Sequence, residues 1–227
     1  WRLEGYMAYG FNDKKFKHGF SGKFLLDRKN RLIISGGNRR DIEQLGLSLT
    51  STNDVMGRSI ASSSLVTVGS NDRLTNINLS TLNVEMEPVK NFRIDVGGSF
   101  RTLSSALPDA FSLDYVDPNS PSGISSEIKQ FDLTTTLIYT PGKRTIGYGV
   151  ERSNINDDYS TLVLKYTKGV DGFLESDFDY EKIQFSYQQP WQIGGFGRLT
   201  STVELGKTFG AVPLGLLSVI PGNQTLF

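Results

Sequence analysis

Between Tyr159 and Thr208, apolar and polar side chains alternate in three successive runs separated by a few turn-forming residues. Each run has about ten residues, the length with which a tilted strand crosses a bilayer. In the last two runs the apolar face holds Ile183, Phe185, Leu199, Val203 and Leu205, and the opposite face holds Lys182, Arg198 and Glu204. This pattern is typical of strands with lipid on one side and a polar lumen on the other. We therefore predict an all-β fold, a transmembrane antiparallel up-and-down β-barrel in the bacterial outer membrane.

The amino-acid composition excludes several classes of protein. Lys and Arg total 24 and Asp and Glu total 24, and this zero net charge argues against nucleic acid as a partner. Cysteine is absent, which excludes disulfides and thiol chemistry. No stretch approaches the roughly 18 consecutive apolar residues of a membrane helix. The length of 227 residues fits a single domain, 1–227.

About ten segments have the alternation of strands: 2–10, 16–27, 31–39, 75–87, 92–103, 128–140, 143–152, 159–168, 178–190 and 196–208. Many exceed the five or six residues usual in soluble sheets. Aromatic side chains gather near the predicted strand ends, namely Tyr9, Phe11, Tyr139, Tyr159, Phe178, Tyr180, Trp191 and Phe209. Their placement resembles the aromatic girdle of a membrane barrel.

The connections alternate between short and long. Segments 27–30, 88–91 and 141–144 have the composition of tight turns, whereas about 46–74 and 104–127 are long and polar. Outer-membrane barrels place short turns in the periplasm and long loops outside. Connections 169–177 and 193–197 break this alternation if ten strands are counted, so either one strand is miscounted or the loop sizes vary.

The segment 75–87 changes phase, because Ile77 and Leu79 have one parity whereas Leu82, Val84 and Met86 have the other. A β-bulge near residues 80–81 would restore a single apolar face. Charged residues of both signs are then predicted on the lumen face: Arg2, Glu4, Lys23, Arg93, Asp95, Arg101, Asp132, Glu151, Lys165, Lys182, Arg198 and Glu204. Mixed signs disfavour a strongly ion-selective pore.

Three groups of segments carry a resemblance to a known family. They are 5–19 (GYMAYGFNDKKFKHG) with 41–46 (DIEQLG), 164–169 (LKYTKG) with 178–182 (FDYEK), and 206–213 (GKTFGAVP) running into 221–223 (PGN). Together they resemble the C-terminal barrel of a Bacteroidota outer-membrane family of unknown function. Members often carry an N-terminal carboxypeptidase-regulatory-like domain, which is not a peptidase. The resemblance implies location and fold rather than an activity.

Catalytic and metal-binding motifs are weak. Gly206-Lys207-Thr208 lacks the first glycine of a phosphate loop, since position 201 is Ser201. His18 is the only histidine, which disfavours a catalytic triad. Two acidic segments suit calcium by composition, and the candidate ligands are Asp157, Asp158, Asp171, Asp177 and Asp179. Neither segment has the spacing of a calcium loop, so we expect no cofactor, and calcium is the one alternative that remains.

The leading hypothesis is a non-enzymatic integral outer-membrane protein that serves as a subunit or platform in envelope biogenesis, transport or surface-protein handling. Its expected partners are outer-membrane lipid and other outer-membrane or surface proteins in a complex. The alternatives are a passive diffusion channel, a soluble β-rich carbohydrate-binding protein and a barrel hydrolase. We also expect the chain to be part of a larger barrel, in which 2–10 and 196–208 do not pair and further strands lie before Trp1 or after Phe227.

Overall fold

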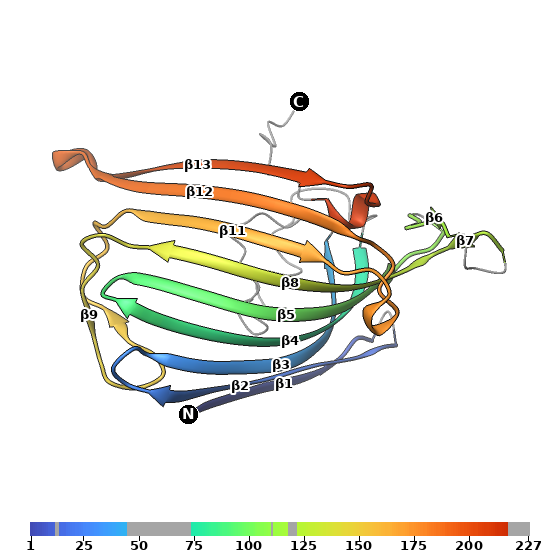
Figure 1. Ribbon diagram of the computed structural model, residues 1–227, viewed down its shortest axis with the longest axis horizontal. Coiled ribbons are helices and arrows are strands. Elements are labelled where there is room, and N and C mark those ends of the chain that lie inside the picture. Colours follow the sequence, from blue (N-terminus) through green and yellow to red (C-terminus); the bar gives the residue numbers. More distant parts are fainter. Residues whose placement is uncertain (12–13, 45–73, 110, 118–121, 218–227) are drawn as a thin grey trace.

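The structure is a computed structural model, and it describes the chain except for residues 12–13, 45–73, 110, 118–121 and 218–227. Nine antiparallel strands form one sheet in the order β1-β2-β3-β4-β5-β8-β11-β12-β13 (Figure 1). Their bounds are β1 Arg2–Tyr9, β2 Phe16–Asp27, β3 Leu32–Gln44, β4 Leu74–Val89, β5 Phe92–Ser105, β8 Glu127–Tyr139, β11 Thr161–Gly169, β12 Tyr180–Gln192 and β13 Arg198–Phe209. The predicted all-β class and antiparallel sheet are confirmed.

Short elements occupy the connections. They are the pairs β6 Tyr115–Val116 with β7 Ile124–Ser125 and β9 Thr145–Ile146 with β10 Ser153–Asn154, and the 3-10 turns η2 Phe173–Glu175, η3 Gly194–Phe196 and η4 Leu214–Leu216. Within the described residues, no helix has the length and apolar character needed to cross a membrane.

Nine of the ten predicted strands exist, and the prediction of a strand over 143–152 is wrong. Ile146, Tyr148 and Val150 alternate in sequence, but only Thr145–Ile146 pairs, and it pairs with Ser153–Asn154 rather than with the main sheet. Gly147 has φ of +117°, which turns the chain out of an extended path, and Tyr148 is 90% exposed. Alternation alone does not make a strand without a neighbouring edge to pair with.

Removing this strand resolves the irregular alternation of connections. The tight turns 28–31, 90–91 and 193–197 now fall at one end of the sheet, which we call the turn end, on the left of Figure 1. Connections 106–126 and 170–179 fall at the opposite end, the loop end. The 140–160 connection is the one long segment between described strands at the turn end. The predicted long connection 46–74 lies almost entirely outside the described residues.

The strands alternate between a convex and a concave face, and paired residues share a face. Parity and register place Ile183, Phe185, Leu199, Val203 and Leu205 on the convex face with Leu82, Val96, Leu133 and Leu164. The concave face holds the predicted charged set, Arg2, Glu4, Lys23, Arg93, Asp95, Arg101, Asp132, Lys165, Lys182, Arg198 and Glu204. Glu151 lies in the 140–160 connection instead. Exposure agrees with this division, since Lys182 is 8% exposed and its neighbour Ile183 is 44% exposed.

No bulge interrupts β4 near residues 80–81, because its register with β3 and β5 is continuous there. The predicted bulge is therefore wrong. Ile77 lies on the concave face and is 5% exposed, whereas Leu82 lies on the convex face and is 63% exposed. The apolar pattern changes phase because two different apolar surfaces exist, one on each side of the sheet.

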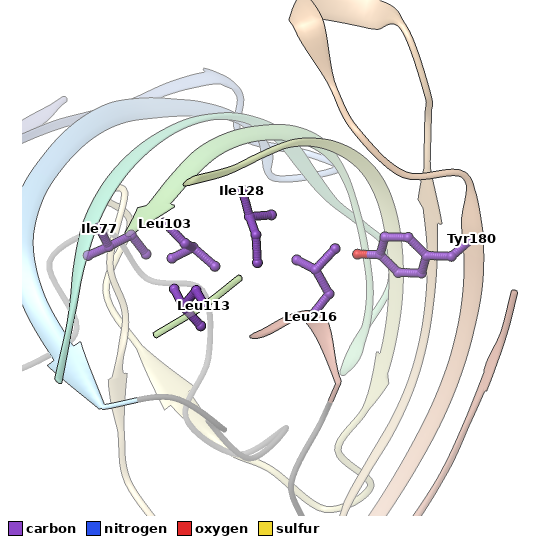
Figure 2. Close-up of a cluster of buried hydrophobic side chains, with 6 residues drawn as sticks. All are labelled: Ile77, Leu103, Leu113, Ile128, Tyr180 and Leu216. Carbon is purple, nitrogen blue, oxygen red and sulfur yellow. The ribbon is translucent and has the colours of Figure 1, made fainter. Parts of the chain in front are cut away.

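The concave apolar surface is a compact cluster at the loop end. It consists of Ile77, Leu103, Leu113, Ile128, Tyr180 and Leu216, with Leu79, Phe111, Tyr115, Phe178 and Val212 packed against it. Figure 2 shows the sheet curving around these side chains. Leu113 and Leu216 come from connections rather than from the sheet, so these segments fold into the concave side and cover Ile77 and Ile128.

The sheet is curved but not closed. β1 and β13 stand at the two ends of the strand order and do not pair with each other, as the sequence predicted. Both strands start at the turn end and run in the same direction, because an odd number of strands separates the two edges of an up-and-down sheet.

Candidate functional site

The concave face carries a buried charged group next to the apolar cluster. Asp132 on β8 accepts a hydrogen bond from Tyr180 Oη at 2.8 Å and pairs with the guanidinium of Arg101, which also donates to Tyr180 Oη at 3.2 Å. Gly169 makes room for this arrangement, because a Cβ at that position would lie 2.3 Å from the Tyr180 ring. The two charges pair with each other in a region where unpaired charge is costly, although Arg101 Nε has no hydrogen-bond partner among the described residues.

Tyr180 was predicted to belong to an interfacial aromatic girdle, and that prediction is wrong. It is 2% exposed and faces inward, and Phe178 packs beside it against Tyr115, with 5.0 Å between ring centroids. Tyr9, Tyr139, Trp191 and Phe209 are instead exposed aromatics. The lumen parity of Lys182, two residues from Tyr180, was the signal that could have identified Tyr180 as inward-facing.

Hydrogen bonds tie the connections at the loop end to the sheet. Lys182 Nζ donates to the Leu216 carbonyl at 2.6 Å, and Gln130 Nε2 donates to the Phe178 carbonyl at 3.0 Å. The backbone amide of Lys129 donates to Asp177 Oδ2 at 2.7 Å. These contacts hold the 170–179 and 210–217 segments against the apolar cluster, so that the concave side is covered at this end.

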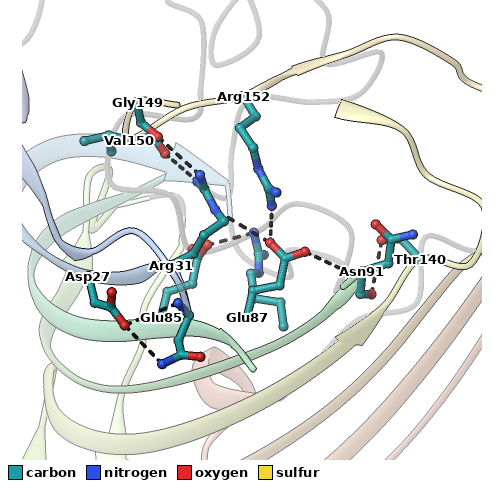
Figure 3. A network of polar contacts seen from close by, with 11 residues as sticks. Asp27, Arg31, Glu85, Glu87, Asn91, Thr140, Gly149, Val150 and Arg152 are labelled. Carbon is teal, nitrogen blue, oxygen red and sulfur yellow. Dashed lines mark hydrogen bonds and ion pairs between the residues drawn. The ribbon is translucent and has the colours of Figure 1, made fainter. Parts of the chain in front are cut away.

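A second charged group covers the turn end. Glu87 at the end of β4 pairs with both Arg31 and Arg152, and Arg31 donates to the carbonyls of Gly149 and Val150 at 3.2 and 2.9 Å (Figure 3). The Glu87 side chain is 10% exposed. Burial, with the nearby charge of Arg152, lowers the pKa of the Arg31 guanidinium, while Glu87 opposes this shift.

These contacts fasten the 140–160 connection across the sheet, and we call this segment the strap. It leaves β8 in the middle of the strand order, reaches β3 and β4 through Arg31 and Glu87, and reaches β1 through the ion pair of Glu151 with Arg2. Asn156 Nδ2 donates to the Gly142 carbonyl, and Asn156 Oδ1 accepts from the backbone amide of Arg144. These two hydrogen bonds close the base of the strap. The strap thus bridges strands that are far apart in the sheet.

Neutralising Glu87 should loosen the strap. In Glu87→Gln, two arginines lose their carboxylate, and charge-assisted hydrogen bonds contribute about 1.5–3 kcal/mol each. We expect hydrogen exchange of the 147–156 amides to accelerate by about tenfold or more. Asp27→Asn is the matched control. Asp27 accepts hydrogen bonds from Lys29 and Asn30 in the neighbouring turn, and among the described residues it does not bind the strap. Unchanged exchange in Glu87→Gln would show that this charged group does not hold the strap.

The calcium candidates do not form one site. Asp157 and Asp158 lie at the turn end, where Arg198 binds the former and Asn156 donates to the latter at 2.6 Å. At the opposite end Asp177 accepts from a backbone amide, Asp179 pairs with Lys168, and Asp171 is exposed. Within the described part of the chain, no group of three acidic or histidine side chains could hold a metal.

The remaining motifs also occupy structural positions. His18 Nε2 lies 3.2 Å from Asn38 Oδ1 on the convex face. Lys207 lies on the convex face of β13, with its Nζ 4.7 Å from the centroid of Phe209, so Gly206-Lys207-Thr208 is a strand segment and not a phosphate loop.

Comparison with known proteins yields one relationship. No curated protein and no solved structure matches the chain. The model of the C-terminal domain of a family of unknown function, DUF5686, matches residues 1–214. This match covers the whole main sheet, including the central Arg101, Asp132 and Tyr180 group and the strap. The chain therefore belongs to the DUF5686 family, as its C-terminal domain.

Proposed function

We propose that this domain is an integral barrel of the bacterial outer membrane, without enzymatic activity, that serves as a subunit or platform in envelope biogenesis, transport or surface-protein handling. The observation that carries the proposal is the exposed apolar belt on the convex face. Contiguous exposed apolar surface of this extent marks contact with lipid or with another protein.

The belt has the dimensions expected for a membrane. On β5 it runs from Phe92 to Phe100, roughly 26 Å along the strand at about 3.3 Å per residue. A tilt of about 40° reduces this to roughly 20 Å, close to the apolar band of about 25 Å on outer-membrane barrels. Toward the loop end the convex residues become polar on successive strands, namely Arg40, Asn78, Thr102, Lys129, Lys168 and Glu181. The strands would thus extend beyond the lipid at that end.

This arrangement supports an orientation. Bacterial barrels place short turns in the periplasm and long loops outside the cell. The turn end would then face the periplasm together with the strap, and the loop end would face the exterior. The 106–126 and 170–179 connections would form part of an external surface on which partner proteins could bind.

Coverage of the concave side favours a platform over an open pore. The apolar cluster fills the loop end, and the strap crosses the turn end. Next to the cluster, Arg101, Asp132 and Tyr180 pair with one another rather than lining a channel with one sign of charge. This mutual pairing suits a structural interior.

Closure of the barrel needs further strands. Since β1 and β13 run in the same direction, joining them would make a parallel contact, whereas single-chain bacterial barrels are antiparallel with an even number of strands. We propose that an odd number of additional strands joins these two edges. Backbone groups left unpaired in lipid would each cost several kcal/mol.

Two measurements test the proposed function. The full-length protein should sediment with membranes after lysis and be extracted only by detergent. Reconstituted in planar bilayers, it should show no sustained conductance. Recovery in the aqueous fraction would favour the soluble carbohydrate-binding alternative, and steady channel currents would favour the diffusion channel.

A further inference from the structure

A hollow opens in the sheet where β2 and β3 diverge. These strands pair only as far as His18 and Arg40; beyond that point β2 continues beside β1, and β3 continues beside β4. The hollow between them has a volume of about 320 Å³ and extends over the convex side of β4 and β5. Lys15 Nζ donates to Asn76 Oδ1 at 3.1 Å across its edge.

The lining of this hollow suits an anion with several acceptor oxygens. Its cations on the convex side are Lys15 and Arg40, and its neutral polar groups include those of Asn76, Asn78 and Ser104. Two carboxylates also line it, Asp41 and Glu127. Asp41 already accepts hydrogen bonds from Tyr6 Oη and the Ile42 amide, both at 2.8 Å. Cationic side chains combined with amide and hydroxyl donors are the usual recognition set for phosphate.

The hollow adjoins the apolar belt directly. On the convex face Asn78 precedes Ser80 and Leu82 along β4, and Phe100 precedes Thr102 along β5. The hollow therefore lies at the boundary at which lipid headgroups meet acyl chains. An apolar surface beside the site would contribute nothing to the binding of a free anion. It would contact the acyl chains of an anionic lipid.

The convex surface near the hollow continues the apolar belt. Leu82 is 63% exposed on β4 and lies in one row with Gly22, Gly36 and Gly98. Neighbouring apolar side chains lie over the outer two glycines of this row, Leu3 and Phe24 beside Gly22 and Phe131 and Leu133 beside Gly98. The belt is therefore continuously apolar at the level of Leu82.

We propose that the hollow binds the phosphate headgroup of an anionic lipid whose acyl chains lie along Leu82 and Phe100. This inference rests on the proposed membrane location. Basic pockets at the membrane boundary bind anionic headgroups through this combination of charge and adjacent apolar surface.

The test uses the full-length protein in mild detergent, titrated with phosphatidylglycerol or phosphatidylcholine and read by native mass spectrometry. We expect the double variant Lys15→Gln, Arg40→Gln to bind phosphatidylglycerol about 25-fold more weakly, at about fivefold for each cation removed. Binding of phosphatidylcholine should not change. Asn78→Asp, which adds a negative charge to the hollow while keeping both cations, should weaken phosphatidylglycerol binding as well.

Lys207→Gln provides the matched control. It removes one positive charge from the convex face of β13, away from the hollow, and should leave lipid affinity unchanged. Equal phosphatidylglycerol affinity in the wild type, the double variant and Asn78→Asp would overturn the inference. Inorganic phosphate that displaced the lipid at equal concentration would overturn the lipid assignment in favour of a free anion. A protein found in the aqueous fraction would refute the proposed function itself, whereas a membrane protein without lipid preference would refute only this site.

Discussion

Replacing Val203 with arginine should lower the free energy of unfolding in lipid vesicles by about 2–4 kcal/mol, the cost of a cation on the lipid face near the bilayer midplane. Val203 is 51% exposed on the convex face of β13 and pairs with Tyr187, inside the apolar belt. Urea titration followed by tryptophan fluorescence measures the change.

Thr202→Arg is the matched control, because Thr202 is the preceding residue and lies on the concave face beside Gln188. An exposed position there accepts a charge with a change of about 0.5 kcal/mol. Losses of similar size in the two variants would contradict a lipid-facing convex surface. A loss confined to Val203→Arg supports both the facing and the membrane location.

Removing the carboxylate of Asp132 is the second large perturbation. In Asp132→Ala, Arg101 is left without its counter-ion, and breaking a buried ion pair costs about 3–5 kcal/mol. Because the Arg101 side chain is 26% exposed while Asp132 is 3% exposed, water can solvate part of the orphaned charge. We therefore expect a loss of about 2–4 kcal/mol in the free energy of unfolding, measured by the same urea titration.

Two further variants separate charge from packing at this position. Tyr180→Phe removes the 2.8 Å hydrogen bond to Asp132 but keeps the ion pair, and should cost about 1 kcal/mol. The double variant Arg101→Met, Asp132→Leu removes both charges and should recover most of the stability lost in Asp132→Ala. If Asp132→Ala were no more destabilising than Tyr180→Phe, the ion pair would not be the dominant interaction of this group.

The sequence predicted most of the sheet because the face that a strand residue occupies follows from its position among its immediate neighbours in the chain. On β12 and β13, a period of two assigns each side chain to a face without reference to distant residues. This is why the inward positions of Lys182 and Glu204, and the outward positions of Phe185 and Leu205, agree with the register.

The errors arise where distant segments decide the outcome. The 143–152 segment alternates like a strand, but it does not join a sheet edge. Its side chains bind β1 through Glu151 with Arg2, and β4 through Arg152 with Glu87. The sequence placed Ile77 on the lipid side and Tyr180 at the membrane interface. No neighbouring residue indicates that an apolar cluster forms on the concave side of the sheet.

By itself the sequence determined that this protein is all-β, that its long strands carry an apolar and a charged face, and which face most residues of β12 and β13 occupy. Only the tertiary structure decided how the concave charges pair, that the strap covers the turn end, and that connections cover the loop end with an apolar cluster. The physical reason is that alternation along one strand specifies the direction of a side chain, whereas its partner depends on which strands become neighbours and where the connections fold back.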